Sequence, residues 1–282
     1  MKLIVAKNAG FCFGVRRAIE ETQKLLHSKK KSIYSIGSLI HNEIVINKLK
    51  EEGLIEINDL DDINNLKNET VIIRTHGVEK KIKELLINNG NEIIDLTCPF
   101  VSKIHEIVDK YTNDSYTIIV IGDKNHPEVK GIVSYGRDVY IVSNEDDISA
   151  LNIPRNNKIL AVFQTTINSG NAEKLVDILS KIYYNIKVVN TICNTTRDRQ
   201  EEVVSLAKVL DVMLIIGSKT SSNTMKLFEI AKRYCDKTYL ITDKTSLNSI
   251  KINKNEKVGV SAGASTPQYL IEEILTNVRN EF

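Results

Sequence analysis

Three of the four cysteines stand in the same kind of place, after an apolar, strand-like run and before a helical pattern. Cys12 follows KLIVAKNAGF, Cys98 follows NEIIDLT and Cys193 follows IKVVNTI. Thiolates bind soft metals and act as nucleophiles, although a single cysteine is more often a small buried hydrophobe. The fourth, Cys235, ends the helical pattern 224–234 and has no counterpart, so we expect it to pack in a core.

The three cysteines are 86 and 95 residues apart, which suggests a repeated unit of domain size. In each unit, a strand ending in Ile-Gly leads to a polar group 28 to 30 residues after the cysteine, and a later strand leads to a second polar group 64 to 72 residues after it. The first group is His41, His126 or Ser221-Ser222-Asn223, and the second is His76, Thr165 or Ser265.

Short apolar runs alternate with amphipathic stretches along the whole chain. This alternation is typical of parallel sheets that are covered by helices on both faces. We therefore predict an α/β fold with three pseudo-repeated lobes of mostly parallel sheets around a central cluster cavity. The predicted divisions are 1–13 for the N-terminal strand and first cysteine at the centre, then 14–98, 99–193 and 194–282 for lobes 1, 2 and 3.

The chemistry-bearing residues all follow strands. Ligands of open parallel sheets bind beyond the carboxyl ends of the strands, so the repeat would direct three cysteines and six polar positions toward one site. Serine, threonine, asparagine and histidine are also common helix caps and turn formers. The matched offsets across three units favour ligands over caps.

Three thiolates without any CxxC pair are unusual for structural zinc, which takes four protein ligands. They suit a [4Fe–4S] cluster, which normally takes four cysteines. With three, one iron would lack a protein ligand and would be an open Lewis-acid position, which indicates an enzyme rather than an electron carrier. A zinc ion held by three cysteines and a water remains an alternative.

The polar positions are rich in donors and poor in carboxylates. They include three of the five histidines, and several fall at expected helix N-termini, which attract anions. A compact polyanion such as a diphosphate fits such a shell. One acid, Glu128, follows His126-Pro127. It is either a favourable partner of the helix dipole or, in a closed apolar-walled site, a general acid with a raised pKa.

Composition excludes several classes of protein. The 282 residues are 42% hydrophobic and 26% charged with a net charge of +2, and no basic block suggests nucleic-acid binding. No apolar run reaches the roughly 18 residues that cross a bilayer, and the first residues lack a signal peptide's apolar core. We expect a cytoplasmic protein that binds neither membrane nor nucleic acid.

Taken together, the motifs resemble the 4-hydroxy-3-methylbut-2-enyl diphosphate reductase family. The matching stretches cover almost the entire chain in order, and the three cysteine contexts together with HPEV and SSN make the set specific. They are AGFCFGVRRAIE, GSLIHN, RTHGV, DLTCPFV, GDKNHPEVKG, QTT, NTICNTTRDRQ, GSKTSSNT and SAGASTP.

The resemblance implies an activity and a role for each site residue. The family reduces its allylic diphosphate by two-electron dehydroxylation to isopentenyl and dimethylallyl diphosphates, the last step of the methylerythritol phosphate route of isoprene biosynthesis. One [4Fe–4S] cluster per chain would be held by Cys12, Cys98 and Cys193, and Glu128 would deliver protons. The expected substrate-binding residues are His41, His76, His126, Thr165, Ser221, Ser222, Asn223 and Ser265.

The source of electrons and two alternative functions remain open at this point. No strand-turn-helix GxGxxG element is present, so we expect a separate ferredoxin or flavodoxin as the electron donor. A dehydratase or isomerase could use an open iron without net redox change. A non-enzymatic cluster protein would not need the anion-binding groups at matched offsets.

Overall fold

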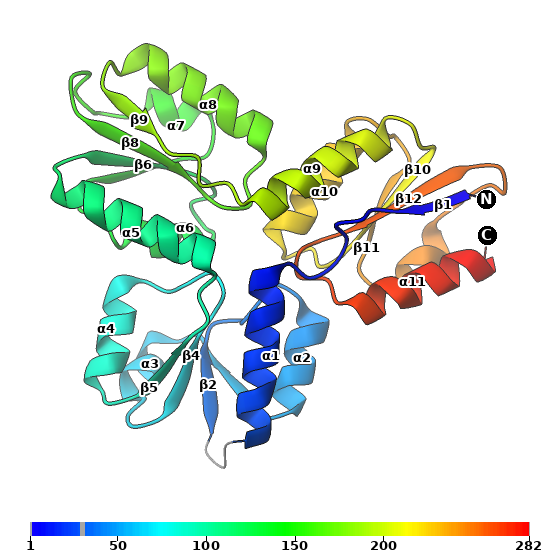
Figure 1. Cartoon of the computed structure of the whole chain (residues 1–282), viewed down its shortest axis with the longest axis horizontal. Helices are drawn as coiled ribbons and strands as arrows, with labels where there is room; N and C mark the ends of the chain where they lie inside the picture. Colours follow the sequence, from blue (N-terminus) through cyan, green and yellow to red (C-terminus); the bar gives the residue numbers. More distant parts are fainter. Residues whose placement is uncertain (1, 29–31, 282) are drawn as a thin grey trace. The chain divides into compact units, whose positions relative to one another are not determined.

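The computed structural model describes residues 2–28 and 32–281. Its strands form three four-stranded sheets in which every pairing is parallel (Figure 1). The chain divides into two compact units. The first combines residues up to Arg16 with His41–Asn47 and the chain from Cys193 onward, and the second contains Arg17–Ile40 and Lys48–Ile192.

The first unit contains one sheet with the strand order β1-β12-β10-β11. Its strands are β1 (Lys2–Val5), β10 (Val212–Ile216), β11 (Thr238–Ile241) and β12 (Lys257–Ala262). Its helices are α9 (Asn194–Ala207), α10 (Ser222–Lys232), the 3₁₀ helix η1 (Lys244–Ser249) and α11 (Gln268–Glu281).

Strand β10 shows why the sequence forms this sheet. Its five residues, VMLII, are all buried. Val212, Leu214 and Ile216 pack in the core that includes α11. Met213 and Ile215 point to the other face and pack with α9 and α10. Because helices cover both faces, the strand needs an uninterrupted apolar run rather than an alternating one.

The second unit contains two sheets with the strand orders β3-β2-β4-β5 and β7-β6-β8-β9. Their strands are β2 (Ile33–Ile36), β3 (Leu54–Ile57), β4 (Thr70–Ile73), β5 (Glu92–Asp95), β6 (Thr117–Ile121), β7 (Val139–Val142), β8 (Ile159–Phe163) and β9 (Ile186–Val188). The helices are α3 (Leu60–Asn65), α4 (Lys80–Asn88), α5 (Pro99–Asn113), α6 (Pro127–Val133), α7 (Glu145–Ser149) and α8 (Ser169–Ile182). Helices α1 (Phe13–Ser28) and α2 (Glu43–Glu51) have residues in both units.

All three sheets have the same strand order. If β1 is counted as the fourth strand of its sheet, each sheet runs second-first-third-fourth. The predicted α/β fold with three pseudo-repeated, parallel lobes is thereby confirmed. The convergence of the lobes on a common cavity stays a prediction, as do the divisions at residues 1–13, 14–98, 99–193 and 194–282.

In the part of the chain that the structure describes, no helix combines the length and apolar character that a bilayer crossing requires.

Candidate active site

The repeat places each kind of predicted site residue after an equivalent strand. Cys12, Cys98 and Cys193 follow the edge strands β1, β5 and β9. The first polar groups follow the first strand of each sheet, and the second polar groups follow the third. These positions are His41 after β2, His126 after β6, Ser221, Ser222 and Asn223 after β10, and His76, Thr165 and Ser265 after β4, β8 and β12.

Glu128 and Thr165 form a buried pair in the second unit. Thr165 donates to the Glu128 carboxylate twice, from its backbone N to Oε1 at 2.6 Å and from its Oγ1 to Oε2 at 2.7 Å. Glu128 is only 1% exposed. It lies in the first turn of α6, whose N-cap His126 accepts the Glu128 N–H on Nδ1 at 3.2 Å. The pair therefore joins the end of β8 to the start of α6.

Gly122 permits this close approach. A Cβ at position 122 would lie 2.8 Å from Cβ of Gln164 and 2.9 Å from a methyl group of Val129. Contacts this short would force the neighbouring segments apart. The glycine thus lets α6 pack against the end of β8, and this packing brings Glu128 to Thr165.

Burial raises the pKa of Glu128 from an ordinary value of 4.5 to about 7. The two hydrogen bonds from Thr165 favour the ionised form and oppose this rise. Desolvation prevails because the carboxyl group is fully enclosed. A carboxyl group that titrates near neutrality can hold a proton and release it during a reaction, as a general acid requires.

His76 and His126 lie next to each other in the same unit. Their rings meet edge to face, with centroids 5.3 Å apart and planes at 83°. His76 lies in a turn closed by Gly77 N donating to Arg74 O at 3.0 Å and by Arg74 Nε donating to Gly77 O at 3.3 Å. Thr75 of the same turn contacts a predicted cluster ligand, because Thr75 O accepts Cys98 N at 2.9 Å.

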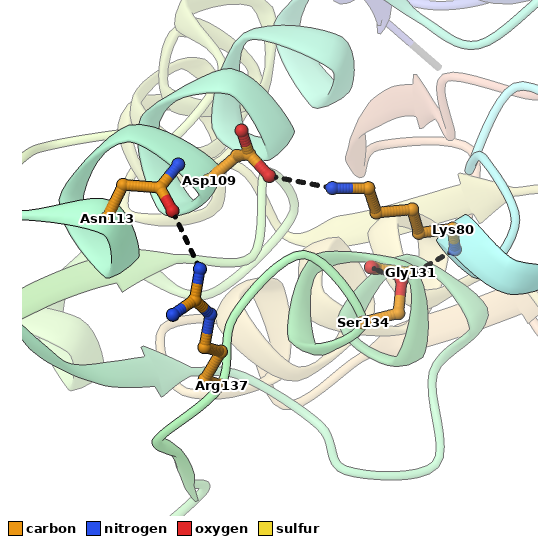
Figure 2. Close-up of polar contacts among 6 residues, drawn as sticks. All are labelled: Lys80, Asp109, Asn113, Gly131, Ser134 and Arg137. Carbon is orange, nitrogen blue, oxygen red and sulfur yellow. Dashed lines mark hydrogen bonds and ion pairs between the residues drawn. The ribbon is translucent and has the colours of Figure 1, made fainter.

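Polar contacts join the helix that follows this turn to the helix that carries Glu128 (Figure 2). Ser134, the C-cap of α6, accepts Lys80 N at 2.9 Å and donates to Gly131 O at 2.6 Å. Lys80 Nζ also pairs with Asp109 of α5 at 2.9 Å. The Ser134 hydroxyl therefore supplies the first turn of α4 with the cap that Glu79 does not provide. These contacts hold the His76 turn at a fixed place relative to α6.

A second polar cluster lies in the first unit. Ser221 is the N-cap of α10 and accepts Thr224 N at 3.3 Å. The Ser265 hydroxyl donates to His41 O at 2.9 Å, and its oxygen is hydrogen-bonded to the Ser221 hydroxyl at 3.3 Å. Asn223 is 4% exposed, and among the described residues neither its amide nitrogen nor its amide oxygen has a hydrogen-bond partner. A buried amide of this kind is a candidate donor and acceptor for a polar ligand.

Gly217 allows Thr224 to pack under this cluster. Its φ is +148°, and an added Cβ would lie 2.6 Å from Thr224 Oγ1 and 2.7 Å from Thr266 Oγ1. Both the backbone conformation and the space require glycine here. The first turn of α10 can therefore pack close to the end of β10.

The cysteines differ in burial. Cys12, Cys98 and Cys193 are half-buried thiols outside any disulfide. Cys98 and Cys193 are the N-caps of α5 and α9, and neither side chain makes a capping hydrogen bond. Cys12 N donates to Ala264 O at 3.1 Å. Cys235 is buried in the core between α9, β10 and α10, which confirms its expected packing role.

Arg199 is a residue of this region that the motif alignment did not single out. It lies on the buried face of α9 with Thr196, Gln200 and Val203. A cation at the apolar positions of an amphipathic helix was the available signal, because charged residues are rarely buried without a reason.

Comparisons with known proteins agree on one family. The family model described as "LytB protein" matches residues 3–279. The chain is 41% identical over 282 residues to the 4-hydroxy-3-methylbut-2-enyl diphosphate reductase of Caldanaerobacter subterraneus subsp. tengcongensis, covering 99% of this chain and 97% of the relative. It is 42% identical over 283 residues to the enzyme of the same name from Campylobacter fetus subsp. fetus, covering 99% and 98%.

Solved structures show the same relationship. The E-1-hydroxy-2-methyl-but-2-enyl-4-diphosphate reductase from Plasmodium falciparum matches with a TM-score of 0.92 at 32% identity, covering 99% of this chain and 88% of that one. A structure titled (E)-4-hydroxy-3-methyl-but-2-enyl diphosphate reductase, the terminal enzyme of the non-mevalonate pathway, matches with a TM-score of 0.71 at 36% identity, covering 99% and 100%. The resemblance seen in the sequence motifs is confirmed, and the chain belongs to the LytB protein family.

Proposed function

We propose that the chain reduces 4-hydroxy-3-methylbut-2-enyl diphosphate to isopentenyl and dimethylallyl diphosphates, the last step of the methylerythritol phosphate pathway. Relatives that carry the reductase name align over 99% of the chain. The observation that carries the proposal for this particular chain is the Glu128–Thr165 pair, a proton-holding group beside the expected substrate-binding residues. No comparison favours the non-redox dehydratase or isomerase.

The proposed cofactor is one [4Fe–4S] cluster per chain, held by Cys12, Cys98 and Cys193. The donor set fits, because all three are half-buried thiols that follow equivalent edge strands. Two of them cap helix N-termini, where thiolates are favoured. When bound, the cluster would supply electrons one at a time and a Lewis-acid position for the substrate.

The protein's own residues bind the substrate and move the proton. The diphosphate accepts hydrogen bonds from the donor shell, including the Asn223 amide and the N–H groups of the first turn of α10. Protonated Glu128 delivers its proton, through the Thr165 hydroxyl, to the oxygen that leaves as water. The other proposed substrate-binding residues are His41, His76, His126, Ser221, Ser222 and Ser265.

The pKa of Glu128 predicts the pH dependence of the reaction. Because its pKa is raised to about 7 and the acid form is the active one, kcat should fall as pH rises through about 7. We expect the fall to follow a single titration in anaerobic assays with saturating substrate and a pH-independent reductant. A kcat that stays constant from pH 6 to about pH 9 would contradict the assignment of Glu128 as the acid.

Asn223 provides a test of the substrate site. Replacing Asn223 by Ala removes hydrogen bonds to a charged ligand that are worth about 1.5–3 kcal/mol. KM should therefore rise about tenfold or more with a smaller change in kcat. The matched control is Asn277→Ala, because Asn277 is half-buried on α11 and its side-chain amide donates to the carbonyl of Glu273. Equal KM values in the two variants would show that Asn223 does not bind the substrate.

The electrons are proposed to come from a ferredoxin or flavodoxin that docks transiently. Contacts between redox proteins are small and partly electrostatic. The donor can be identified by comparing rates with each purified protein under the same anaerobic conditions.

One anaerobic assay tests the whole proposal. The reconstituted protein is given the allylic diphosphate with and without dithionite plus a viologen, and the products are analysed. We expect both five-carbon diphosphates and water only when the reductant is present. Turnover without reductant would favour the dehydratase or isomerase, and an iron-loaded protein without turnover in either case would indicate a non-enzymatic cluster protein.

A further inference from the structure

Arg199 is a buried cation with unusual partners. It is 3% exposed on the inner face of α9. Its Nη1 donates to Ala262 O at 3.0 Å and its Nη2 donates to Gly10 O at 2.6 Å. Within the described part of the first unit, no carboxylate forms a salt bridge with it, and its Nε has no partner. Two backbone carbonyls are thus the only hydrogen-bond acceptors that it has among the described residues.

Such a charge needs compensation. Burying a cation without an anionic partner is costly, and arginine cannot avoid the cost by losing its proton. Burial lowers the pKa of Arg199, and electrostatic interactions with Cys12, Glu202 and Cys193, in that order of size, oppose this shift. Two of these three residues, Cys12 and Cys193, are proposed cluster ligands, so the buried cation lies within electrostatic range of both.

The same arginine also connects the segments that carry these two cysteines. Gly10, whose carbonyl it binds, lies two residues before Cys12. Cys193 is the N-cap of the helix to which Arg199 belongs. One side chain therefore fixes the loop of the first cysteine to the helix that starts at the third.

A second residue of α9, Glu202, binds the same loop at the protein surface. The Glu202 carboxylate accepts Lys7 N at 2.6 Å and Asn8 N at 3.1 Å, and both contacts are exposed. Glu202 therefore holds the loop without placing a positive charge in the interior. Substituting Glu202 tests how α9 holds the loop, whereas substituting Arg199 also tests the effect of the buried charge.

We propose that Arg199 is a positioning residue for the [4Fe–4S] cluster and that its fixed positive charge makes the cluster easier to reduce. This inference rests on the proposed function, which supplies the cluster. Each reduction step transfers one electron from the reduced viologen to the cluster, with no bond formed or broken and no proton taken up. A nearby buried cation stabilises the more negative, reduced form more than the oxidised form.

The experiment compares Arg199→Gln, Arg199→Lys and Glu202→Gln in the holoenzyme. The reduction potential of the cluster is measured by anaerobic titration with viologens, followed by visible absorbance and electron paramagnetic resonance. Arg199→Gln should lower the equilibrium constant for reduction about tenfold, which is about 59 mV for a one-electron couple. Arg199→Lys keeps the charge and should stay within about threefold of the wild type. Glu202→Gln loosens the same loop but removes a negative charge, so it should leave the potential unchanged or raise it.

The outcomes separate this inference from the proposed function. A wild-type protein that assembles no cluster would sink the proposed function itself. A wild-type cluster that titrates at the same potential as the cluster of Arg199→Gln would overturn only the role of Arg199. If Arg199→Gln assembles no cluster, full iron content and a wild-type potential in Arg199→Lys would support the proposed role of the positive charge. Loss of iron in both variants would assign Arg199 to holding the loop alone and overturn the electrostatic role.

Discussion

Replacing Glu128 by Gln should lower kcat by about a hundredfold to ten-thousandfold and leave the iron content and visible absorbance unchanged. Glutamine has nearly the same shape, and its amide oxygen can still accept the Thr165 N–H that now binds Oε1. It cannot deliver a proton. Steady-state anaerobic kinetics with dithionite and a viologen measure the loss.

The pH behaviour of folding provides a check that this loss is chemical. The folded-state pKa of Glu128 is raised above its unfolded value of 4.5 to about 7. Its contribution to stability is therefore fully present below pH 4.5 and is lost as pH rises through about 7. The Gln variant has no carboxylate to ionise in the interior, so it should resist urea at pH 8 at least as well as the wild type.

A matched substitution controls for removal of a carboxylate in general. Glu106 is exposed on α5 in the same unit, with 68% of its side chain accessible. Glu106→Gln should keep the wild-type rate. If both Glu128→Gln and Glu106→Gln retain near-normal rates, another group must deliver the proton. The hydrogen bonds between Glu128 and Thr165 would then serve only to stabilise the fold.

The parts of the fold that sequence patterns predicted are those where burial is complete. The five consecutive apolar residues 212–216 predict a strand, and the structure forms β10 there with both faces covered. The sequence does not predict strand β3 in this way. It lies at the edge of its sheet, only Leu54 of its four residues is buried, and Ile55 is 42% exposed. An edge strand in contact with solvent carries no continuous apolar run.

One strand ends earlier than the sequence predicts, for a local reason. The apolar and β-branched run 187–191 predicts a strand over all five residues, but β9 ends at Val188. The Thr191 hydroxyl accepts Phe163 N at 2.8 Å and donates to Phe163 O at 2.6 Å. A side chain here makes the hydrogen bonds that the next ladder position would have made. β-Branched composition alone could not distinguish these two uses of the residue.

Residues of the candidate site were predictable where the same kind of residue recurs at a matched offset in all three units. Matched offsets singled out Thr165 and placed Glu128 beside the matched position His126, but they gave no reason to expect the hydrogen bonds that join the two residues across 37 positions. Arg199 had no matched partner in the repeat, and its helical spacing with buried positions of α9 did not reveal which groups it contacts. A repeat therefore predicts which strand ends bear functional groups, whereas the electrostatics depend on contacts between elements.

The second large effect is expected at Cys98. Replacing it by Ser should abolish the brown absorbance of the reconstituted protein or leave a fragile cluster with reduced iron content, and turnover should be lost with it. A serine hydroxyl does not ionise at neutral pH and is a poor ligand for iron in a sulfur cluster, whereas thiolate is the ligand form of cysteine. Iron and sulfide analysis together with visible spectra measure the result.

The helix that Cys98 caps makes this substitution more informative than most. Cys98 is the N-cap of α5 and makes no side-chain capping hydrogen bond. Serine is among the favoured N-cap residues, so the variant should fold at least as well as the wild type, and cluster loss could not be attributed to unfolding of α5. The control is Cys235→Ala, which removes a buried core thiol and should lower stability while iron content stays normal. Wild-type iron and absorbance in Cys98→Ser would show that Cys98 is not a ligand, and the three-cysteine site would have to be abandoned.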